Sequence, residues 1–281
     1  MNTVRLEAGD LMWRIRTWGH PMRPAIVFLH GFTWDGAAWA PVAEALSDRF
    51  YCVAPDLPGH GATSWPEPTA EWSFDRVVDA LLAVLVKLNL VAPHVVGYSM
   101  GGRLALRLAL RHAIPMERLV LIGASAGLEH PHDRSDRVRS DAELAQRLVS
   151  EGMEAFLDRW MALPLFETMR SLDPALLAKL NAGRANQHPG GLAASLATMG
   201  TGSQPYLLEA LSGLPMPTML VVGEHDQKFR AIAEQMYARL PQGRLEVLPG
   251  CGHSIPFERP EALSALLTTF FTEAPLATSL T

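Results

Sequence analysis

The chain has 281 residues, of which 48% are hydrophobic, and its formal net charge is −5 at pH 7. This length and apolar content predict one catalytic core with an insertion, and the mildly negative charge disfavours nucleic acid or an anionic membrane surface as a partner. The two cysteines, Cys52 and Cys251, are expected to be reduced thiols. The first ten residues lack the basic and then apolar pattern of a signal peptide, and no apolar stretch is long enough to span a membrane. We therefore expect a cytoplasmic protein.

Strand-like and helix-like segments alternate along the chain. Predicted strands cover residues 11–18, 25–29, 51–54, 94–96, 118–122, 218–222 and 244–248, and predicted helices cover residues 38–46, 75–90 and 102–110. Such alternation predicts an α/β fold with a mostly parallel, doubly wound sheet that has helices on both faces. Residues 125–214 are charged, helical and without a strand, so we expect a core of residues 1–124 and 215–281 with residues 125–214 inserted as a helical lid. Residues 274–281 are expected to fray.

The pentapeptide Gly97-Tyr98-Ser99-Met100-Gly101 carries the strongest catalytic signal, because it follows an apolar strand and opens a helix. A nucleophile elbow needs this order: the serine takes a strained backbone conformation, and small residues two positions to either side let strand and helix pass closely. The motif alone is weak evidence, since an idle serine in a glycine-rich turn has the same sequence. It becomes specific when an acid and a histidine follow downstream.

Asp226 and His253 supply these partners in the expected order of serine, acid and histidine. Each lies just after a predicted strand, where open α/β sheets place their chemistry. A serine hydroxyl needs a histidine to take its proton, and the histidine needs a carboxylate to hold it in one tautomer. Taken singly, Asp226 could be a loop acid paired with Lys228, and His253 could be a surface histidine. Glu224 is a rival acid that we rank below Asp226.

The segment Phe28-Leu29-His30-Gly31-Phe32 predicts an oxyanion hole. A backbone N–H in the loop after this strand joins the N–H of the residue that follows the nucleophile, and these residues are Phe32 and Met100. His30 is expected to orient this loop through hydrogen bonds rather than to act as a second base.

No cofactor or metal site is expected. The turn Asp56-Leu57-Pro58-Gly59-His60-Gly61 is rich in glycine, but it lacks the third glycine and the following helix of a dinucleotide fingerprint. His130, His132 and Asp133 could suggest a metal, yet their sequence is typical of a polar loop without a helical or strand frame.

Longer motifs accompany the triad. They are GYSMGGR at residues 97–103, AGLEHPHDRSDRVRSD at 126–141, FLDRW at 156–160 with PLF at 164–166, GTGSQPYL at 200–207 and GEHDQKF at 223–229. On these residues the chain, from about Ile26 to Pro260, resembles the α/β-hydrolase superfamily and, within it, the MenH family. That family comprises the 2-succinyl-6-hydroxy-2,4-cyclohexadiene-1-carboxylate synthases of menaquinone biosynthesis. Ala126 stands where the family usually has proline.

The resemblance implies an α/β-hydrolase fold and a small-molecule substrate with three carboxylates. Arginine suits such a ligand because its planar fork pairs bidentately with carboxylate and keeps its charge. Arg103 lies four residues after Ser99, so one helical turn could place it beside the serine. By match to the family's motifs, Arg137 and Arg184 would also bind the substrate, and two aromatic residues, Tyr98 and Trp160, would line the site. For each arginine the alternative is a solvated helix face.

The resemblance also implies a carbon–oxygen lyase that needs no cofactor. It would eliminate pyruvate from 2-succinyl-5-enolpyruvyl-6-hydroxy-3-cyclohexene-1-carboxylate, with Ser99 acting as a base after His253 takes its proton. Two alternatives keep the same triad: a serine esterase and a carbon–carbon bond hydrolase. A third is a non-catalytic receptor for a small molecule, against which the complete triad argues. Dehalogenase or epoxide hydrolase chemistry is disfavoured, because it uses a carboxylate nucleophile where this chain has Ser99.

Overall fold

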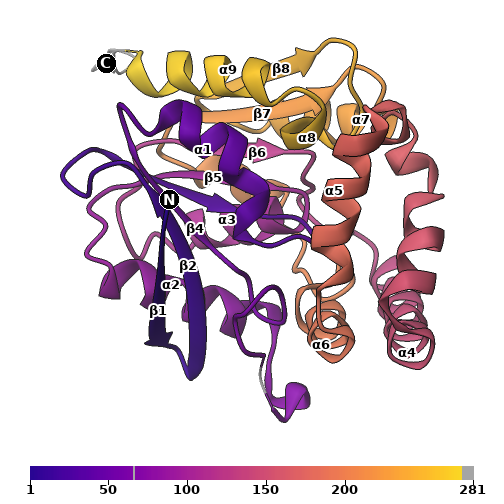
Figure 1. Ribbon diagram of the computed structural model, residues 1–281. Coiled ribbons are helices and arrows are strands. Elements are labelled where there is room, and N and C mark those ends of the chain that lie inside the picture. The colour runs from indigo at the N-terminus through magenta and orange to yellow at the C-terminus, as the bar shows by residue number, and fades with distance from the viewer. Residues whose placement is uncertain (66, 274–281) are drawn as a thin grey trace.

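An eight-stranded sheet forms the centre of the protein (Figure 1), in a computed structural model that describes residues 1–65 and 67–273. Its strands lie in the order β1-β2-β4-β3-β5-β6-β7-β8. They are β1 (Asn2–Ala8), β2 (Leu11–Trp18), β3 (Ala25–Leu29), β4 (Tyr51–Pro55), β5 (His94–Tyr98), β6 (Leu119–Ile122), β7 (Thr218–Gly223) and β8 (Gly243–Leu248). Neighbours from β4 to β8 are parallel, whereas β1 and β2 pair in antiparallel fashion. The predicted α/β fold with a mostly parallel sheet is confirmed.

Strand β1 was not predicted from the sequence. Its side chains are almost all exposed, so it has no alternation of buried and exposed residues that could reveal a strand. It pairs with β2 along its full length at the edge of the sheet, from Asn2 opposite Thr17 to Ala8 opposite Leu11. The strand is therefore held mainly by its backbone ladder, and among its described residues only Leu6 and Ala8 near its end pack against the core.

Helices cover both faces of the sheet (Figure 1), as the doubly wound arrangement requires. One face packs against α1 (Ala40–Leu46) and α9 (Pro260–Thr272). The other packs against α2 (Phe74–Lys87), α3 (Met100–Ala109) and α7 (Gln227–Tyr237). The chain outside the segment between β6 and β7 also contains short helical turns: η1 (Gly36–Trp39), η2 (Thr69–Glu71) and α8 (Ile255–Glu258). Of the described helices, none has the length and apolar character to cross a membrane.

Helix α2 ends three residues before the predicted end at residue 90. Its first turn is capped by Ser73, whose hydroxyl accepts a hydrogen bond from the Arg76 N–H. At the other end Asn89 has a φ of 51°, in the left-handed region that stops a helix. The apolar pattern continues beyond Lys87 and so does not reveal this stop.

The chain between β6 and β7 is helical, and no strand occurs there among the described residues. We call residues 125–214 the helical segment; it contains α4 (Pro131–Met161), η3 (Pro164–Phe166), η4 (Met169–Ser171), α5 (Pro174–Ala185), α6 (Pro189–Met199) and η5 (Glu209–Gly213). The prediction of a polar loop at His132 and Asp133 was wrong, because both lie in the first turn of α4. Proline at the first helical position and an acid in the first turn favour a helix start there. The domain boundaries stay a prediction, and residues 274–281 lie outside the described chain.

Candidate active site

Ser99 occupies a strained turn between β5 and α3. Its backbone has φ 51° and ψ −110°, outside the φ/ψ regions favoured by residues that carry a side chain. A Cβ on Gly97 would lie 2.5 Å from the Gly101 carbonyl oxygen, and one on Gly101 would lie 2.3 Å from the Leu29 carbonyl oxygen. Only glycine therefore fits on either side of the serine, and the turn holds the Ser99 side chain at the carboxyl end of the sheet.

Ser99, His253 and Asp226 form one hydrogen-bonded chain. His253 Nε2 lies 3.1 Å from Ser99 Oγ, and His253 Nδ1 lies 2.7 Å from Asp226 Oδ2. His253 and Asp226 are both buried. The three side chains meet because β5, β7 and β8 are close in a parallel sheet and the loop after each carries one of them. Their catalytic roles stay a prediction, for which this geometry has the required hydrogen bonds.

Asp226 is fixed by its place at the start of α7. It caps this helix, and its Oδ1 accepts a hydrogen bond from the Phe229 N–H at 3.3 Å. The Phe229 ring in turn packs 4.5 Å from the His253 ring. The rival acid, Glu224, is exposed and accepts the Gly250 N–H at 2.8 Å. The structure therefore places Asp226, and not Glu224, against the histidine.

The two amides predicted for the oxyanion hole have no hydrogen-bond partner within the described chain. Met100 is the first residue of α3, so its N–H has no carbonyl one turn earlier in the helix. Phe32 lies in the loop of residues 30–35 between β3 and η1, which we call the oxyanion loop after its predicted role. A Cβ on Gly31 would lie 2.8 Å from the Tyr98 ring, so this loop packs directly against the residue before Ser99.

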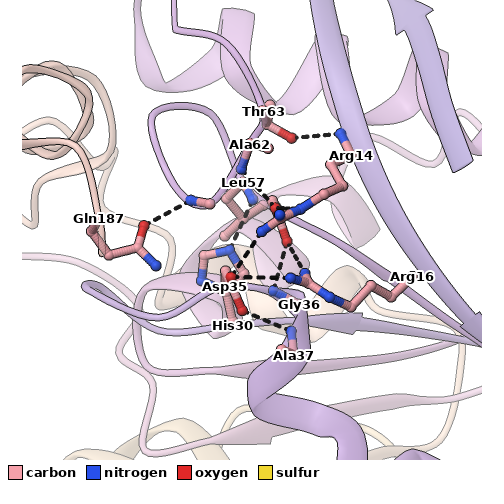
Figure 2. A network of polar contacts seen from close by, with 12 residues as sticks. Arg14, Arg16, His30, Asp35, Gly36, Ala37, Leu57, Ala62, Thr63 and Gln187 are labelled. Atoms are coloured by element: carbon pink, nitrogen blue, oxygen red, sulfur yellow. Dashed lines mark hydrogen bonds and ion pairs between the residues drawn. The ribbon is translucent and has the colours of Figure 1, made fainter. Parts of the chain in front are cut away.

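A buried ion network clamps the far end of the oxyanion loop (Figure 2). Asp56 is fully buried and accepts hydrogen bonds from Arg14 Nε and Arg16 Nη1. It also accepts the Gly36 N–H at 2.8 Å and the Ala62 N–H at 2.9 Å. A buried carboxylate needs such compensation, because burial without partners would cost several kcal/mol. The carboxylate of the predicted glycine-rich turn therefore binds the protein's own donors.

His30 and Asp35 connect the oxyanion loop to the same network (Figure 2). His30 Nε2 accepts the Leu57 N–H at 2.8 Å, so its Nδ1 carries the proton and donates to the Gly31 carbonyl oxygen at 2.8 Å. Burial lowers the pKa of His30, which keeps the ring neutral. Asp35 accepts from Arg14 Nη2 at 2.9 Å and from the Ala37 N–H at 2.8 Å. Hydrogen bonds of His30 with Leu57 and of Gly36, which adjoins the loop, with Asp56 thus connect both ends of the loop to the residues that follow β4.

A cavity of about 1090 Å³ lies over Ser99, between the core and the helical segment. Of the predicted site residues, it is lined by Ser99, Asp226, His253, Phe32, Met100, Tyr98, Arg103, Arg137 and Trp160. Trp160 stacks on Phe156 with ring centroids 5.6 Å apart and meets the Phe32 ring edge-on at 5.4 Å. The helical segment therefore closes the cavity with aromatic rings on the side of the oxyanion loop.

Of the described residues, four arginines line this cavity: Arg103, Arg137, Arg147 and Arg159. We call the two predicted ones, Arg103 and Arg137, its cationic wall. Arg103 donates to the Met199 carbonyl oxygen at 2.8 Å, and Arg137 Nε donates to Asp141 Oδ1 at 2.8 Å. Burial, together with the nearby charge of Arg137, lowers the pKa of Arg103 to about 10, so it remains a cation at neutral pH. Each guanidinium has five N–H donors and uses one in these contacts, which leaves donors for an anionic ligand.

Arg184 lies behind this wall and does not line the cavity. Its side chain is 1% exposed, its Nε donates to Thr33 Oγ1 at 3.0 Å, and its guanidinium lies 4.6 Å from the Trp34 ring centroid. Burial lowers its pKa to about 10. Its role as a substrate contact stays a prediction.

Sequence reasoning missed the residues that hold these arginines. Asp141 is a buried acid that lines the cavity and orients Arg137 from one helical turn away. Its spacing of four residues from Arg137 was the signal that could have found it. Thr33 had no comparable signal, because its partner Arg184 is 151 residues away in the sequence.

Comparisons with known proteins agree with this architecture. A family model described as the alpha/beta hydrolase fold matches residues 24–260. A Bacillus subtilis (strain 168) protein, provisionally named 2-succinyl-6-hydroxy-2,4-cyclohexadiene-1-carboxylate synthase, is 34% identical over 97% of this chain and 99% of its own. The Enterobacter sp. (strain 638) synthase of that name is 34% identical over 89% of this chain and 92% of its own. The chain belongs to this family of synthases.

The family also has a close structural match. The structure of MenH from S. aureus superimposes with a TM-score of 0.87 at 30% identity, covering 92% of this chain and 97% of the other. The predicted α/β-hydrolase fold and the predicted resemblance to the MenH family are therefore both confirmed.

Proposed function

We propose that the protein is a lyase of menaquinone biosynthesis. It eliminates pyruvate from 2-succinyl-5-enolpyruvyl-6-hydroxy-3-cyclohexene-1-carboxylate and forms 2-succinyl-6-hydroxy-2,4-cyclohexadiene-1-carboxylate, the product for which its relatives are named. One observation carries this proposal: a hydrogen-bonded Ser99-His253-Asp226 chain opens into a cavity lined by arginines, among them Arg103 and Arg137. The triad supplies a base, and the arginines supply cations for a polycarboxylate.

In the proposed reaction Ser99 acts as the base. His253 Nε2 takes the hydroxyl proton, and the Ser99 oxygen removes a ring proton next to the succinyl ketone. The electron pair of that C–H bond forms an enolate, whose oxygen accepts hydrogen bonds from the Phe32 and Met100 N–H groups. Re-formation of the ketone moves the electron pair into a new ring double bond at the deprotonated carbon, the existing ring double bond shifts toward the carbon that carries the enolpyruvyl group, and the C–O bond to that group breaks. The leaving enolate takes the proton from His253 and becomes pyruvate. No covalent acyl-enzyme forms.

Recognition of the substrate falls to Arg103 and Arg137 in this proposal, with Tyr98 and Trp160 bounding the cavity. Fixed guanidinium groups favour a trianion over neutral esters, and they hold the ring so that its acidic C–H faces Ser99. The buried, unpaired Cys52 and Cys251 support a cytoplasmic location as part of the same proposal.

The test is a direct assay of pyruvate release. Purified protein treated with EDTA should release pyruvate from the proposed substrate without added cofactor. Its kcat/KM should be several orders of magnitude above that for p-nitrophenyl acetate, because only the trianion engages the cationic wall. Faster ester cleavage, or an acyl group trapped on Ser99 during turnover, would contradict the proposal and favour a serine esterase or a carbon–carbon bond hydrolase.

A further inference from the structure

Arg184 is a buried cation without a counter-ion. No carboxylate lies within ion-pair distance of it in the described chain, and its Nη2 has no hydrogen-bond partner there. Its contacts are instead the Thr33 hydroxyl, the Met161 sulfur at 2.7 Å, Asn181 Oδ1 at 3.5 Å, and the rings of Trp34 and Phe166. An uncompensated buried charge destabilises a fold, so its presence calls for a function that offsets this cost.

The residues that Arg184 touches directly follow the predicted oxyanion donor Phe32. Thr33 has a φ of 69°, a left-handed conformation that is rare for a β-branched residue and strains the backbone. It is fully buried, and its hydroxyl accepts the Arg184 Nε–H. The next residue, Trp34, is packed between the guanidinium and the Phe257 ring, the latter 3.9 Å away. Arg184 thus contacts two successive residues of the strained loop.

The residues just after α5 also pack against the loop after β4. Gln187 Oε1 accepts the Gly61 N–H at 2.7 Å, and Figure 2 shows this side chain reaching across from the helical segment. A Cβ on Gly59 would lie 2.1 Å from the Gly191 carbonyl oxygen, so the two backbones are in direct contact. Residues 184–191 therefore pack against the oxyanion loop and against the loop after β4.

We propose that Arg184 is a positioning residue that holds the oxyanion loop in its strained conformation through Thr33 and Trp34. The ion network of Asp56 fixes the end of the loop at Gly36, and Arg184 fixes it beside Phe32. Docking of the helical segment then sets the direction of the Phe32 N–H. This inference rests on the proposed function of the same site, and it predicts that losing Arg184 harms every reaction that passes through an oxyanion.

The first test replaces the buried guanidinium by an apolar chain of similar length. Arg184→Met should leave the Tm unchanged or raise it, because a buried unpaired charge is removed. It should lower kcat about 10- to 100-fold for both the proposed substrate and a neutral ester, as expected when an oxyanion donor is displaced. Arg107→Met is the matched control: Arg107 pairs with Asp75 away from the cavity, so its loss should lower the Tm and spare kcat.

The second test changes the acceptor. Thr33→Val keeps the shape of the side chain and removes the hydroxyl, so it should lower kcat by about tenfold with little change in KM. Thr33→Ser restores the acceptor and should recover most of the lost kcat. Unchanged kcat in both Arg184→Met and Thr33→Val would overturn the inference. A loss seen only as a higher KM for the polyanionic substrate would also overturn it, because Arg184 would then act on the substrate.

A third measurement separates this inference from the proposed function. A neutral fluorophosphonate reacts with Ser99: the Oγ–P bond forms, the P–F bond breaks, fluoride leaves, and His253 takes the hydroxyl proton. The rate of this labelling, followed by mass spectrometry, should fall about tenfold in Arg184→Met and Thr33→Val relative to the wild type. A wild type that releases no pyruvate would refute the proposed lyase, while the labelling rates would still decide the role of Arg184.

Discussion

The Ser99-His253-Asp226 triad and the cationic wall of the cavity are built in opposite ways. The triad is self-contained: Ser99 and Asp226 both bind His253, and core loops supply all three residues. The wall is open, because Arg103 gives one hydrogen bond to a carbonyl and Arg137 gives one to Asp141. The hydrogen bonds of the triad are therefore complete without a ligand, whereas the two arginines keep N–H donors free for one. Chemistry and recognition can be removed separately in such a site.

The largest effect is expected from the triad. Replacing Ser99, Asp226 or His253 singly by Ala should lower kcat by about 10⁴-fold or more, because the three groups move one proton between them. Combining two replacements should add little, since the first replacement already prevents the proton transfer that the three groups share. Steady-state pyruvate release measures both. Losses that multiply in the double variants would mean that the three residues act independently, and an active Ser99→Ala would exclude Ser99 as the base.

An intermediate effect is expected from the wall. Arg103→Ala and Arg137→Ala should each cost about 2–5 kcal/mol in kcat/KM for the polyanionic substrate, the range for loss of one member of a desolvated charge pair. Arg137, with 41% of its side chain exposed, should fall at the lower end of this range.

A neutral ester is the control for these variants, because it engages the triad and not the wall. Its kcat/KM should stay within about threefold of the wild type in both variants. Equal losses on the two substrates would show that the arginines support the fold and do not bind carboxylates. Measured unfolding temperatures would then fall together with activity.

The same contrast separates what could be predicted from the sequence from what could not. Ser99 and Asp226 follow the buried strands β5 and β7, whose apolar runs are visible in the sequence. His253 follows the half-buried edge strand β8, in which apolar and charged residues alternate, and the parallel sheet brings the carboxyl ends of the three strands together. The positions of Ser99, Asp226 and His253 relative to the strands thus follow from local patterns. The candidate oxyanion amides of Phe32 and Met100 follow from the same frame, although their function stays a prediction.

The described residues of the helical segment include no strands that would fix the direction of its side chains. Its helices pack on each other and on loops, so the direction of an arginine depends on contacts far away in the sequence. Arg103 is placed by α3, which the elbow fixes, and it reaches the cavity. Arg184 is placed by the docking of α5, and it faces Thr33 instead. Family motifs can identify these residues, but only the packing determines which surface each one meets.

The smallest effect is a pH dependence of substrate binding by the cationic wall. The pKa of Arg103 is lowered to about 10, so its charge is complete below pH 9 and declines as the pH rises through 10. Because the charged form binds the anion, kcat/KM for the polyanionic substrate should fall about fourfold between pH 8 and 10.5, where roughly a quarter of Arg103 stays protonated. Uncatalysed elimination is subtracted at each pH, and circular dichroism verifies that the protein stays folded. The ratio of kcat/KM for the polyanion to that for the neutral ester isolates this titration from that of the triad. In Arg103→Ala the ratio should be flat across this range, and a ratio that still falls fourfold in that variant would assign the titration to another group.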